Sequence, residues 1–235
     1  MTERLFLIDG HAQLYRAYHA APNFRAPDGT PTGALHGFSQ LLFNLLETRQ
    51  PQYVAAVFDP KGDTFRHTLS AEYKANREPM PEDLAKQVPL ILEMCRACNL
   101  AVYQVEGYEA DDVIGTLTER AVSAGILVEI VSADKDLMQL VRPGVVMYDA
   151  IRQKEYDEAA VLEAKGVRPD QIADWLALMG DASDNICGVE KVGAKTAVDL
   201  LAEHKTLEGV LAWAEKSFGA AARGEAAGDT ASAKV

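Results

Sequence analysis

The chain has 235 residues, and its 35 acidic and 23 basic side chains give a formal net charge of −12. This length predicts one large domain, or one domain with a small appendage, and a hydrophobic fraction of 48% argues against wholesale disorder. No apolar run approaches the roughly 20 residues that span a bilayer. The start lacks a signal-peptide core, and three cysteines fit a reducing compartment. The sequence therefore disfavours a membrane or secreted protein and predicts a cytoplasmic one.

The first 140 residues alternate short apolar strands with helical segments. The pattern predicts strands at 4–9, 53–59, 101–105 and 126–131 and helices at 33–48, 82–98, 110–124 and 135–141. Strands separated by helices of this size indicate an α/β fold with a mostly parallel central sheet flanked by helices. In such sheets, ligands bind beyond the carboxyl ends of the strands.

The pattern changes after about residue 143. Two short strand-like pieces, VVMYD and IRQKEY, lead into helical sequence at 157–165, 169–179, 194–204 and 206–215. The last segment is rich in Ala and Gly and has no hydrophobic stripe. We therefore expect an α/β core over 1–150, a helical element over 151–216 and a disordered tail over 217–235.

Carboxylates follow all four predicted parallel strands, and two more lie in the helical part. The nine positions are Asp9, Asp59, Glu109, Asp111, Asp112, Asp134, Asp136, Asp181 and Asp184. Each acid alone would serve as a helix cap, but together they repel one another unless cations neutralise them. With almost no His or Cys among them, the set favours Mg²⁺ or Mn²⁺ over zinc. Such a site is typical of two-metal phosphodiester hydrolysis.

The segment 60–81 lacks apolar periodicity and mixes basic with aromatic side chains. These side chains are Lys61, Phe65, Arg66, His67, Tyr73, Lys74 and Arg77. The mixture suits single-stranded nucleic acid, because cations hold phosphates and rings stack on bases. An ordinary solvated loop has the same composition. Beside an acidic metal site, we expect the segment to hold substrate phosphates and to supply positive charge to the transition state.

A glycine-rich turn at 188–196 nearly matches the nucleotide-binding P-loop G-x-x-x-x-G-K-S/T. Ala194 is one residue too many, and no hydrophobic strand precedes the turn. The pattern favours a hairpin between helices 169–179 and 194–204. In that hairpin Gly188 and Gly193 would let backbone amides approach a phosphate of duplex DNA. A purely structural turn is the alternative.

Six segments together resemble the 5′-nuclease (flap endonuclease) superfamily, and most of all the 5′–3′ exonuclease domain of bacterial DNA polymerase I. They are LFLIDGHAQLYRAYHA, VFDPKGDTFRH, EYKANREPMPEDL, GYEADDVIGTL, SADKDLMQLV and LMGDASDNICGVEKVGAKTA. They stand in the family's order and cover about residues 4–210. The resemblance implies a PIN/5′-nuclease-like core with a C-terminal element of the helix–hairpin–helix type.

The resemblance also implies roles for single residues. The nine acids would hold two or more Mg²⁺ or Mn²⁺ ions, with Asp9, Asp111 and Asp134 at the centre of catalysis. Lys74 and Arg77 would contact the scissile phosphate, and the hairpin is often associated with a monovalent cation such as K⁺. The DNA-binding residues expected from the resemblance are Arg16, Arg66, Tyr73, Lys74, Arg77, Gly188, Val189, Gly193, Lys195 and Thr196.

The function implied is a 5′–3′ exonuclease or 5′-flap endonuclease that acts on flaps and on nicked or forked DNA near the nucleoid. A polymerase domain in the same or a separate chain is the expected partner. A PIN-like ribonuclease and a non-catalytic, structure-specific DNA-binding module are the alternatives. Cys187 departs from the family, which usually has proline there. The family also usually continues through further helices beyond the hairpin, so we expect a short form or a fragment of a longer polymerase.

Overall fold

The computed structural model describes residues 3–222, and within them a six-stranded sheet forms the centre. The strands are β1 (Arg4–Asp9), β2 (Tyr53–Val57), β3 (Ala101–Tyr103), β4 (Leu127–Val131), β5 (Val145–Asp149) and β6 (Lys154–Tyr156). Their order is β3-β2-β1-β4-β5-β6, with β1 to β5 parallel and β6 antiparallel to β5. The predicted α/β fold with a mostly parallel sheet is confirmed.

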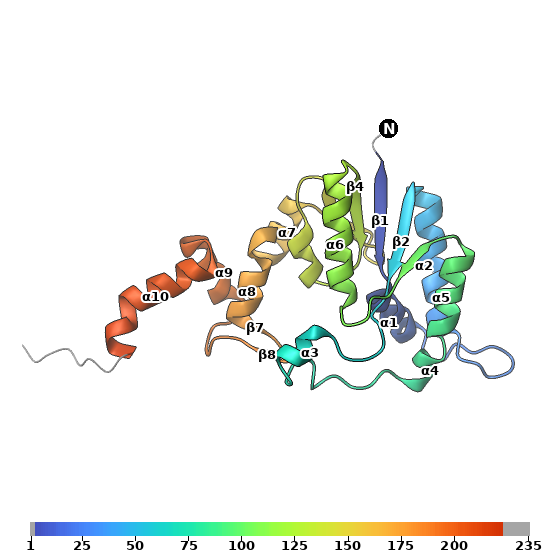
Figure 1. Cartoon of the computed structure of the whole chain (residues 1–235), viewed down its shortest axis with the longest axis horizontal. Coiled ribbons are helices and arrows are strands. Elements are labelled where there is room, and N and C mark those ends of the chain that lie inside the picture. Colours follow the sequence, from blue (N-terminus) through green and yellow to red (C-terminus); the bar gives the residue numbers. More distant parts are fainter. Residues whose placement is uncertain (1–2, 223–235) are drawn as a thin grey trace, which may run out of the picture.

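Helices cover both faces of the sheet, as Figure 1 shows. On β1, Phe6 and Ile8 point into the core beneath α2 (Gly33–Arg49) and α5 (Val88–Ala97). Leu7, on the opposite face, packs in the core beneath α6 (Ala110–Ser123). Alternate residues of a strand point to opposite faces, so a strand that is apolar throughout requires this double covering.

The helical part packs against the edge of the α6 core. It contains α7 (Glu158–Lys165), the 3₁₀ helix η2 (Pro169–Gln171), α8 (Ile172–Met179), α9 (Ala194–His204) and α10 (Leu207–Ala222). A two-stranded ribbon of β7 (Gly180–Asp181) and β8 (Ile186–Cys187) connects α8 to the turn before α9. Trp175 and Leu178 of α8 are buried in the same core as Leu201 of α9. Of the described helices, none is long and apolar enough to cross a membrane.

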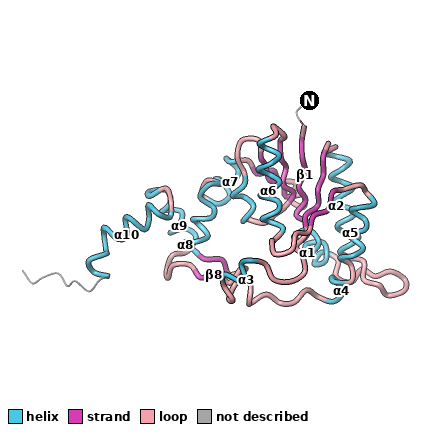
Figure 2. The backbone as a smooth tube through the Cα atoms, in the orientation of Figure 1, coloured by secondary structure: helices cyan, strands magenta, loops and turns pink. Residues whose placement is uncertain are grey.

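The segment between β2 and α5 is mostly loop, as Figure 2 shows, and runs past the carboxyl ends of the strands. It contains two short helices, α3 (Phe65–Leu69) and α4 (Glu82–Ala85). The helix predicted over 82–98 is therefore broken between α4 and α5. Pro89, in the first turn of α5, provides the reason, because its ring suits a helix start and disfavours a helix interior.

Three boundaries differ from the sequence-based expectation. The helix α1 (Gly10–Ala20) follows β1 directly and was not predicted, because few apolar residues mark its buried side. The strand β6 belongs to the central sheet, so the core extends past residue 150. The helix α10 continues to residue 222, six residues into the predicted tail, and the rest of that tail lies outside the described residues.

Candidate metal and DNA site

The predicted acids gather at the carboxyl ends of the strands, around a cavity of about 560 Å³. Seven of the nine line it: Asp9, Asp59, Glu109, Asp111, Asp134, Asp136 and Asp184. Asp112 and Asp181 line an adjoining cavity of about 740 Å³, whose wall also includes Glu109 and Asp184. The structure therefore brings together, in one region, acids that the sequence separates by up to 175 positions.

Asp9 links β1 to α1 and is held by two hydrogen bonds. Its Oδ1 caps the helix by accepting from the Ala12 amide at 3.0 Å, and its Oδ2 accepts from the Ser132 hydroxyl at 2.7 Å. The residue is only 3% exposed. Burial raises the pKa of Asp9 to about 6, although these hydrogen bonds oppose the shift.

The first turn of α6 carries three more acids. Glu109 caps the helix, and its amide donates to Asp112 Oδ2 at 3.0 Å. Asp59, after β2, accepts from the Ala110 amide at 2.7 Å. Asp111 points to the cavity, and burial raises its pKa to about 8, with the charges of Asp9 and Asp134 adding to the effect. The first turn of α6 thus places the Asp111 carboxyl group in a buried position beside other acids, where its negative charge is unfavourable.

Asp134 and Asp136 follow β4 in a tight turn. The Asp134 amide donates to Ser132 Oγ at 3.0 Å, and the Asp136 amide donates to Asp134 Oδ1 at 3.0 Å. The turn continues into the 3₁₀ helix η1 (Asp136–Leu140). Ser132 therefore organises the ends of both β1 and β4, a role that sequence reasoning missed.

The donor set of this cavity fits a hard divalent cation. Within the described chain, Asp9, Asp111 and Asp134 have no ion-pair partner, and their oxygens face a shared space. Such oxygens are the ligands that Mg²⁺ and Mn²⁺ prefer, and bound positive charge would relieve their repulsion. As placed, however, the described His, Cys, Asp and Glu side chains include no group of three that would hold an ion without rearrangement.

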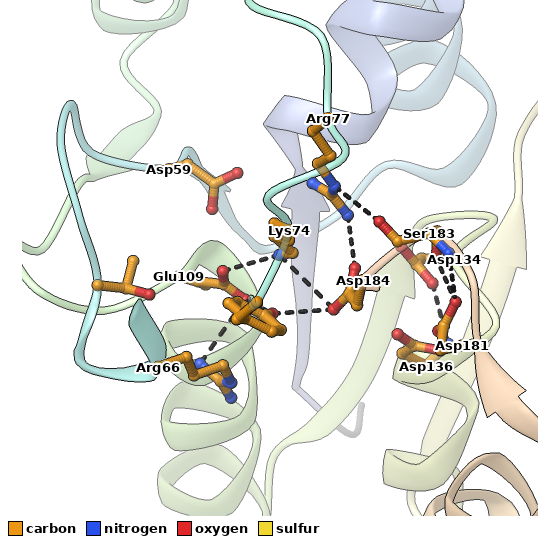
Figure 3. A network of polar contacts seen from close by, with 12 residues as sticks. Asp59, Arg66, Lys74, Arg77, Glu109, Asp134, Asp136, Asp181, Ser183 and Asp184 are labelled. Carbon is orange, nitrogen blue, oxygen red and sulfur yellow. Dashed lines mark hydrogen bonds and ion pairs between the residues drawn. The ribbon is translucent and has the colours of Figure 1, made fainter. Parts of the chain in front are cut away.

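Basic side chains already neutralise several of the other acids. Lys74 Nζ lies 2.7 Å from Glu109 Oε1 and 3.8 Å from Asp184 Oδ2, and Arg77 Nη2 lies 2.7 Å from Asp184 Oδ1 (Figure 3). Arg66 forms two hydrogen bonds with Asp112, at 2.7 and 2.8 Å. Burial opposes ionisation of Asp112, but the Arg66 hydrogen bonds, the Glu109 amide and the charges of Arg66 and Lys74 together lower the pKa of that carboxyl.

Backbone contacts fix the basic segment to the turn after β7. The Lys74 amide donates to the Asp184 carbonyl at 3.0 Å. The Asn76 side-chain amide donates to the Ala182 carbonyl at 2.8 Å, and that of Asn185 donates to the Glu72 carbonyl at 2.7 Å. We refer to these three hydrogen bonds as the joint. The joint places Lys74 and Arg77 on the wall of the acidic cavity.

Two predicted DNA-contacting side chains have different surroundings from those expected. Tyr73 is only 8% exposed, and its hydroxyl lies 2.9 Å from both Glu109 and Asp184. Its ring is therefore not presented to solvent for stacking. Arg16 forms an ion pair with the buried Asp149 at 3.2 Å and does not line the acidic cavity. This pair gives Arg16 a structural role, since an isolated buried carboxylate would be costly.

The glycine-rich turn contains two glycines with different constraints. A Cβ at Gly188 would lie 2.2 Å from the Met179 carbonyl carbon, so this glycine is required for packing. Gly193 caps α9, and a Cβ there would meet nothing within 4 Å. Gly193, with the exposed Lys195 and Thr196 after it, therefore forms an accessible helix N-terminus of the kind that binds phosphate. Val189 is exposed nearby.

Sequence reasoning also missed three residues around the acids. His11 and Tyr15 of α1 line the cavity, and His11 Nδ1 lies 3.6 Å from Asp59. Lys135 Nζ lies 2.6 Å from Asp181 Oδ2. Lys135 stands between two predicted ligands in the sequence SADKD, and this position could have indicated that it lies near the acids. His11 and Tyr15 could be placed near them only once α1 was known.

Models of one protein family match nearly the whole chain. The model described as 5′-3′ exonuclease, N-terminal resolvase-like domain, matches residues 4–166, and the model described as 5′-3′ exonuclease, C-terminal SAM fold, matches residues 167–232. The chain belongs to the 5′–3′ exonuclease family. The boundary between the two models falls after residue 166, one residue beyond the end of α7.

Relatives include a protein named 5′-3′ exonuclease and much longer proteins named DNA polymerase I. The chain is 38% identical over 207 residues to a 5′-3′ exonuclease of Aquifex aeolicus, covering 88% of this chain and 72% of that protein. It is 43% identical over 217 residues to DNA polymerase I of Rhizobium leguminosarum, covering 89% of this chain and 21% of the polymerase. The chain thus spans about a fifth of that polymerase's length.

Solved structures share the fold. The T5 5′-exonuclease with bound divalent metal ions (zinc) superimposes with a TM-score of 0.79 at 22% identity, covering 90% of this chain and 79% of that chain. A bacteriophage T5 flap endonuclease in a complex with DNA and metal ions gives a TM-score of 0.77 at 22% identity, covering 89% and 78%. At this identity the likeness shows the arrangement of the sheet and helices.

Proposed function

We propose that the protein is a metal-dependent 5′–3′ exodeoxyribonuclease and 5′-flap endonuclease that hydrolyses DNA near 5′ ends and single-strand/duplex junctions. The observation that carries the proposal is the cavity lined by seven of the nine predicted acids, with Lys74 and Arg77 on its wall. The names of the relatives support it, since they include a 5′-3′ exonuclease and a flap endonuclease solved with DNA and metal ions.

The acidic residues would hold the ions, for which we propose Mg²⁺ or Mn²⁺. Asp9, Asp111 and Asp134 are the central ligands, because within the described residues none of them has an ion-pair partner. Bound divalent ions lower the pKa of water and stabilise charge on the attacking and leaving oxygens. Lys74 and Arg77 neutralise the phosphoryl oxygens of the scissile bond, exchanging their present carboxylate partners for phosphate.

The turn at 188–196 would hold the duplex beside the cut. The exposed amide end of α9 at Gly193 binds backbone phosphate without reading sequence, and a monovalent cation such as K⁺ assists there. Arg66 contributes to the single-strand side, whereas the buried Tyr73 supports the site through Glu109 and Asp184. A polymerase domain, in the same or a separate chain, would supply the substrate in the cytoplasm, at the nucleoid.

A 5′-flap duplex with a labelled 5′ strand tests the activity. In Mg²⁺ we expect release of short 5′ products, and in EDTA we expect binding without cleavage. An otherwise matched blunt duplex is the control for junction dependence. If the flap duplex binds but no product forms with either Mg²⁺ or Mn²⁺, the protein is a DNA-binding module and the enzymatic proposal is wrong.

The same assay with a single-stranded RNA of the flap sequence addresses the ribonuclease alternative. A PIN-like ribonuclease needs neither the basic segment nor the turn at 188–196. We therefore expect the DNA flap to be cleaved faster than the RNA. Faster cleavage of RNA would assign the site to the alternative.

A further inference from the structure

The ammonium group of Lys135 lies between two of the acids expected to hold metal. Its Nζ is 2.6 Å from Asp181 Oδ2 and 3.1 Å from Asp136 Oδ1. Asp136 belongs to the turn after β4, and Asp181 belongs to β7 of the helical part, so Lys135 connects the two parts of the chain. Figure 3 shows Asp136 and Asp181 facing each other beside Asp134.

Both oxygens of Asp181 already have partners within the protein. Oδ1 accepts from the Ser183 amide at 2.9 Å, and Oδ2 accepts from Lys135. Asp136 Oδ1 is buried beside the same ammonium group. Lys135 therefore offsets one of the two negative charges of this pair, and its ammonium group lies within ion-pair distance of both carboxylates.

The three central acids differ in this respect. Within the described residues, Asp9, Asp111 and Asp134 have no ion pair with any basic side chain. The cavity thus contains three acids without an ion-pair partner among the described residues and a pair, Asp136 and Asp181, that shares one ammonium group. A divalent ion entering among the three acids removes repulsion, whereas an ion entering between the pair meets the positive charge of Lys135.

We propose that Lys135 is a positioning residue that acts as a built-in cation and makes the second divalent ion conditional on substrate. This inference rests on the proposed function, since it assumes that the acids bind divalent ions. The first ion enters among Asp9, Asp111 and Asp134. A second ion enters between Asp136 and Asp181 only after the ammonium group leaves, because that group already lies against Asp136 Oδ1 and Asp181 Oδ2 and would repel the ion.

The fold determines how Lys135 leaves. Its backbone has helical angles (φ −63°, ψ −27°) and lies between β4 and η1, in the body of the core. The side chain is 28% exposed, so its rotation alone can carry the ammonium group away from the two acids. A backbone phosphate of bound DNA offers the ammonium group a new acceptor. DNA binding and second-ion binding then favour each other, and by linkage the effect is reciprocal.

Titration of the metal-free protein with Mn²⁺ tests the proposal without cleavage as the readout. Free Mn²⁺ is measured by electron paramagnetic resonance, with calorimetry in parallel. For the wild type we expect one tight ion and one that binds at least tenfold more weakly. Lys135→Met should tighten the second ion about tenfold or more, and Lys135→Arg, which keeps the charge, should behave as the wild type.

The matched control is Lys154→Met, which removes an exposed ammonium group on β6 and should leave both ions unchanged. Asp181→Asn added to Lys135→Met should weaken the second ion again, because it removes the carboxylate that was freed. Adding a nicked product duplex should tighten the second ion in the wild type and change it by less than threefold in Lys135→Met. Lys135→Gln replaces Lys135→Met if thermal melting shows that the methionine variant is unfolded.

The outcomes separate this inference from the proposed function. If the wild type binds no Mn²⁺ tightly and cuts no flap, the proposed function is wrong. If the wild type binds Mn²⁺ and cuts, but the second ion is unchanged or weaker in folded Lys135→Met and Lys135→Gln, only the role of Lys135 is wrong. Equal tightening by Lys154→Met would also overturn it, because the effect would then reflect net charge alone.

Discussion

Asp111 and Asp9 show how burial sets the charge state of single residues at the site. Their pKa values are raised from 3.8 to about 8 and about 6. A raised carboxyl pKa means that the folded protein binds more protons than the unfolded chain between the two values. With respect to these groups, the metal-free protein is therefore most stable at low pH. As pH rises from 3.8, the contribution of Asp9 is lost by about pH 6 and that of Asp111 by about pH 8.

The first prediction concerns the pH range from 6 to 8. Of Asp9 and Asp111, only Asp111 has a raised pKa that still affects stability there. In EDTA, stability should fall across this window with a slope of up to about 1.4 kcal/mol per pH unit. Asp111→Asn should flatten the slope and raise the melting temperature at pH 8, while abolishing flap cleavage. Thermal melts between pH 6 and 8 measure this, with the exposed Asp199→Asn as the control. An equal slope in both variants would contradict it.

The second prediction concerns Lys74, whose ammonium group holds Glu109 at 2.7 Å. If that group moves to the scissile phosphate, Lys74→Ala should lower kcat for flap cleavage about 100-fold or more. Binding of the flap in EDTA should change far less, since other basic groups share the strand. The control is Lys86→Ala, an exposed lysine next to α4. A loss of binding as large as the loss of rate would show that Lys74 serves only affinity.

At this scale the sequence predicted the acids well and their partners poorly. Seven of the nine acids lie close together because parallel strands end at the same edge, which a sequence pattern can show, and the β7–β8 ribbon adds Asp181 and Asp184. The burial of Tyr73 and the pairing of Arg16 with Asp149 depend on contacts between distant segments. Such contacts leave no periodic signal, so the sequence could not reveal them.

At the scale of elements, the turn between β8 and α9 contains one glycine that is crowded by backbone, Gly188, and one with open space around it, Gly193. The third prediction is that Gly188→Ala destabilises the protein by about 2 kcal/mol or more, since its Cβ would overlap the backbone of Met179. Gly193→Ala should leave the melting temperature unchanged and weaken duplex binding several-fold, because a methyl group would cover the amide end of α9. Thermal melts and fluorescence anisotropy with a blunt duplex distinguish the two.

The reverse pattern would be informative. If Gly193→Ala binds the duplex normally, phosphate does not contact the N-terminus of α9, and the turn is structural. If Gly188→Ala is as stable as the wild type, the β7–β8 ribbon rearranges without cost. Either result would change the account of this turn without affecting the account of the acids.

Elements were predictable where the apolar pattern is strong and uncertain where it is weak. The strands β1, β2 and β4 read as mainly apolar runs, interrupted in β4 by the buried Glu129, because both of their faces are buried. The helix α1 was missed because it buries Gln13 and small residues beside Leu14, which gives no clear stripe. Strand β6 was separated from the core since only Tyr156 of its residues is buried.

For the molecule as a whole, the structure shows where most of the excess negative charge lies. Setting aside the nine acids of the site leaves 26 acids against 23 bases. The excess of acid is thus concentrated at the carboxyl edge of the sheet, where cations and DNA phosphate would meet. Composition alone does not show this, because it does not record where the charges lie.

The fourth prediction is that divalent ions stabilise the whole fold at neutral pH. Ions bound only by the native state at 100 times their Kd should add about 2.7 kcal/mol. For a chain of this length that corresponds to a rise in melting temperature of about 5–10 °C. Melts in Mg²⁺ and in EDTA at equal ionic strength measure it, and Asp111→Asn should lose most of the rise. An equal rise in that variant would indicate binding elsewhere.

The joint between the basic segment and the turn after β7 has a consequence for selectivity. Lys74, Asn76 and Asn185 attach the segment that faces single strand to the part that faces duplex. A junction presents both kinds of DNA at a fixed separation, so the second contact forms within one complex at a high effective concentration. Neither isolated strand nor isolated duplex gains this advantage. The protein would thus select substrates by the geometry of two linked binding events, with neither surface needing high affinity of its own.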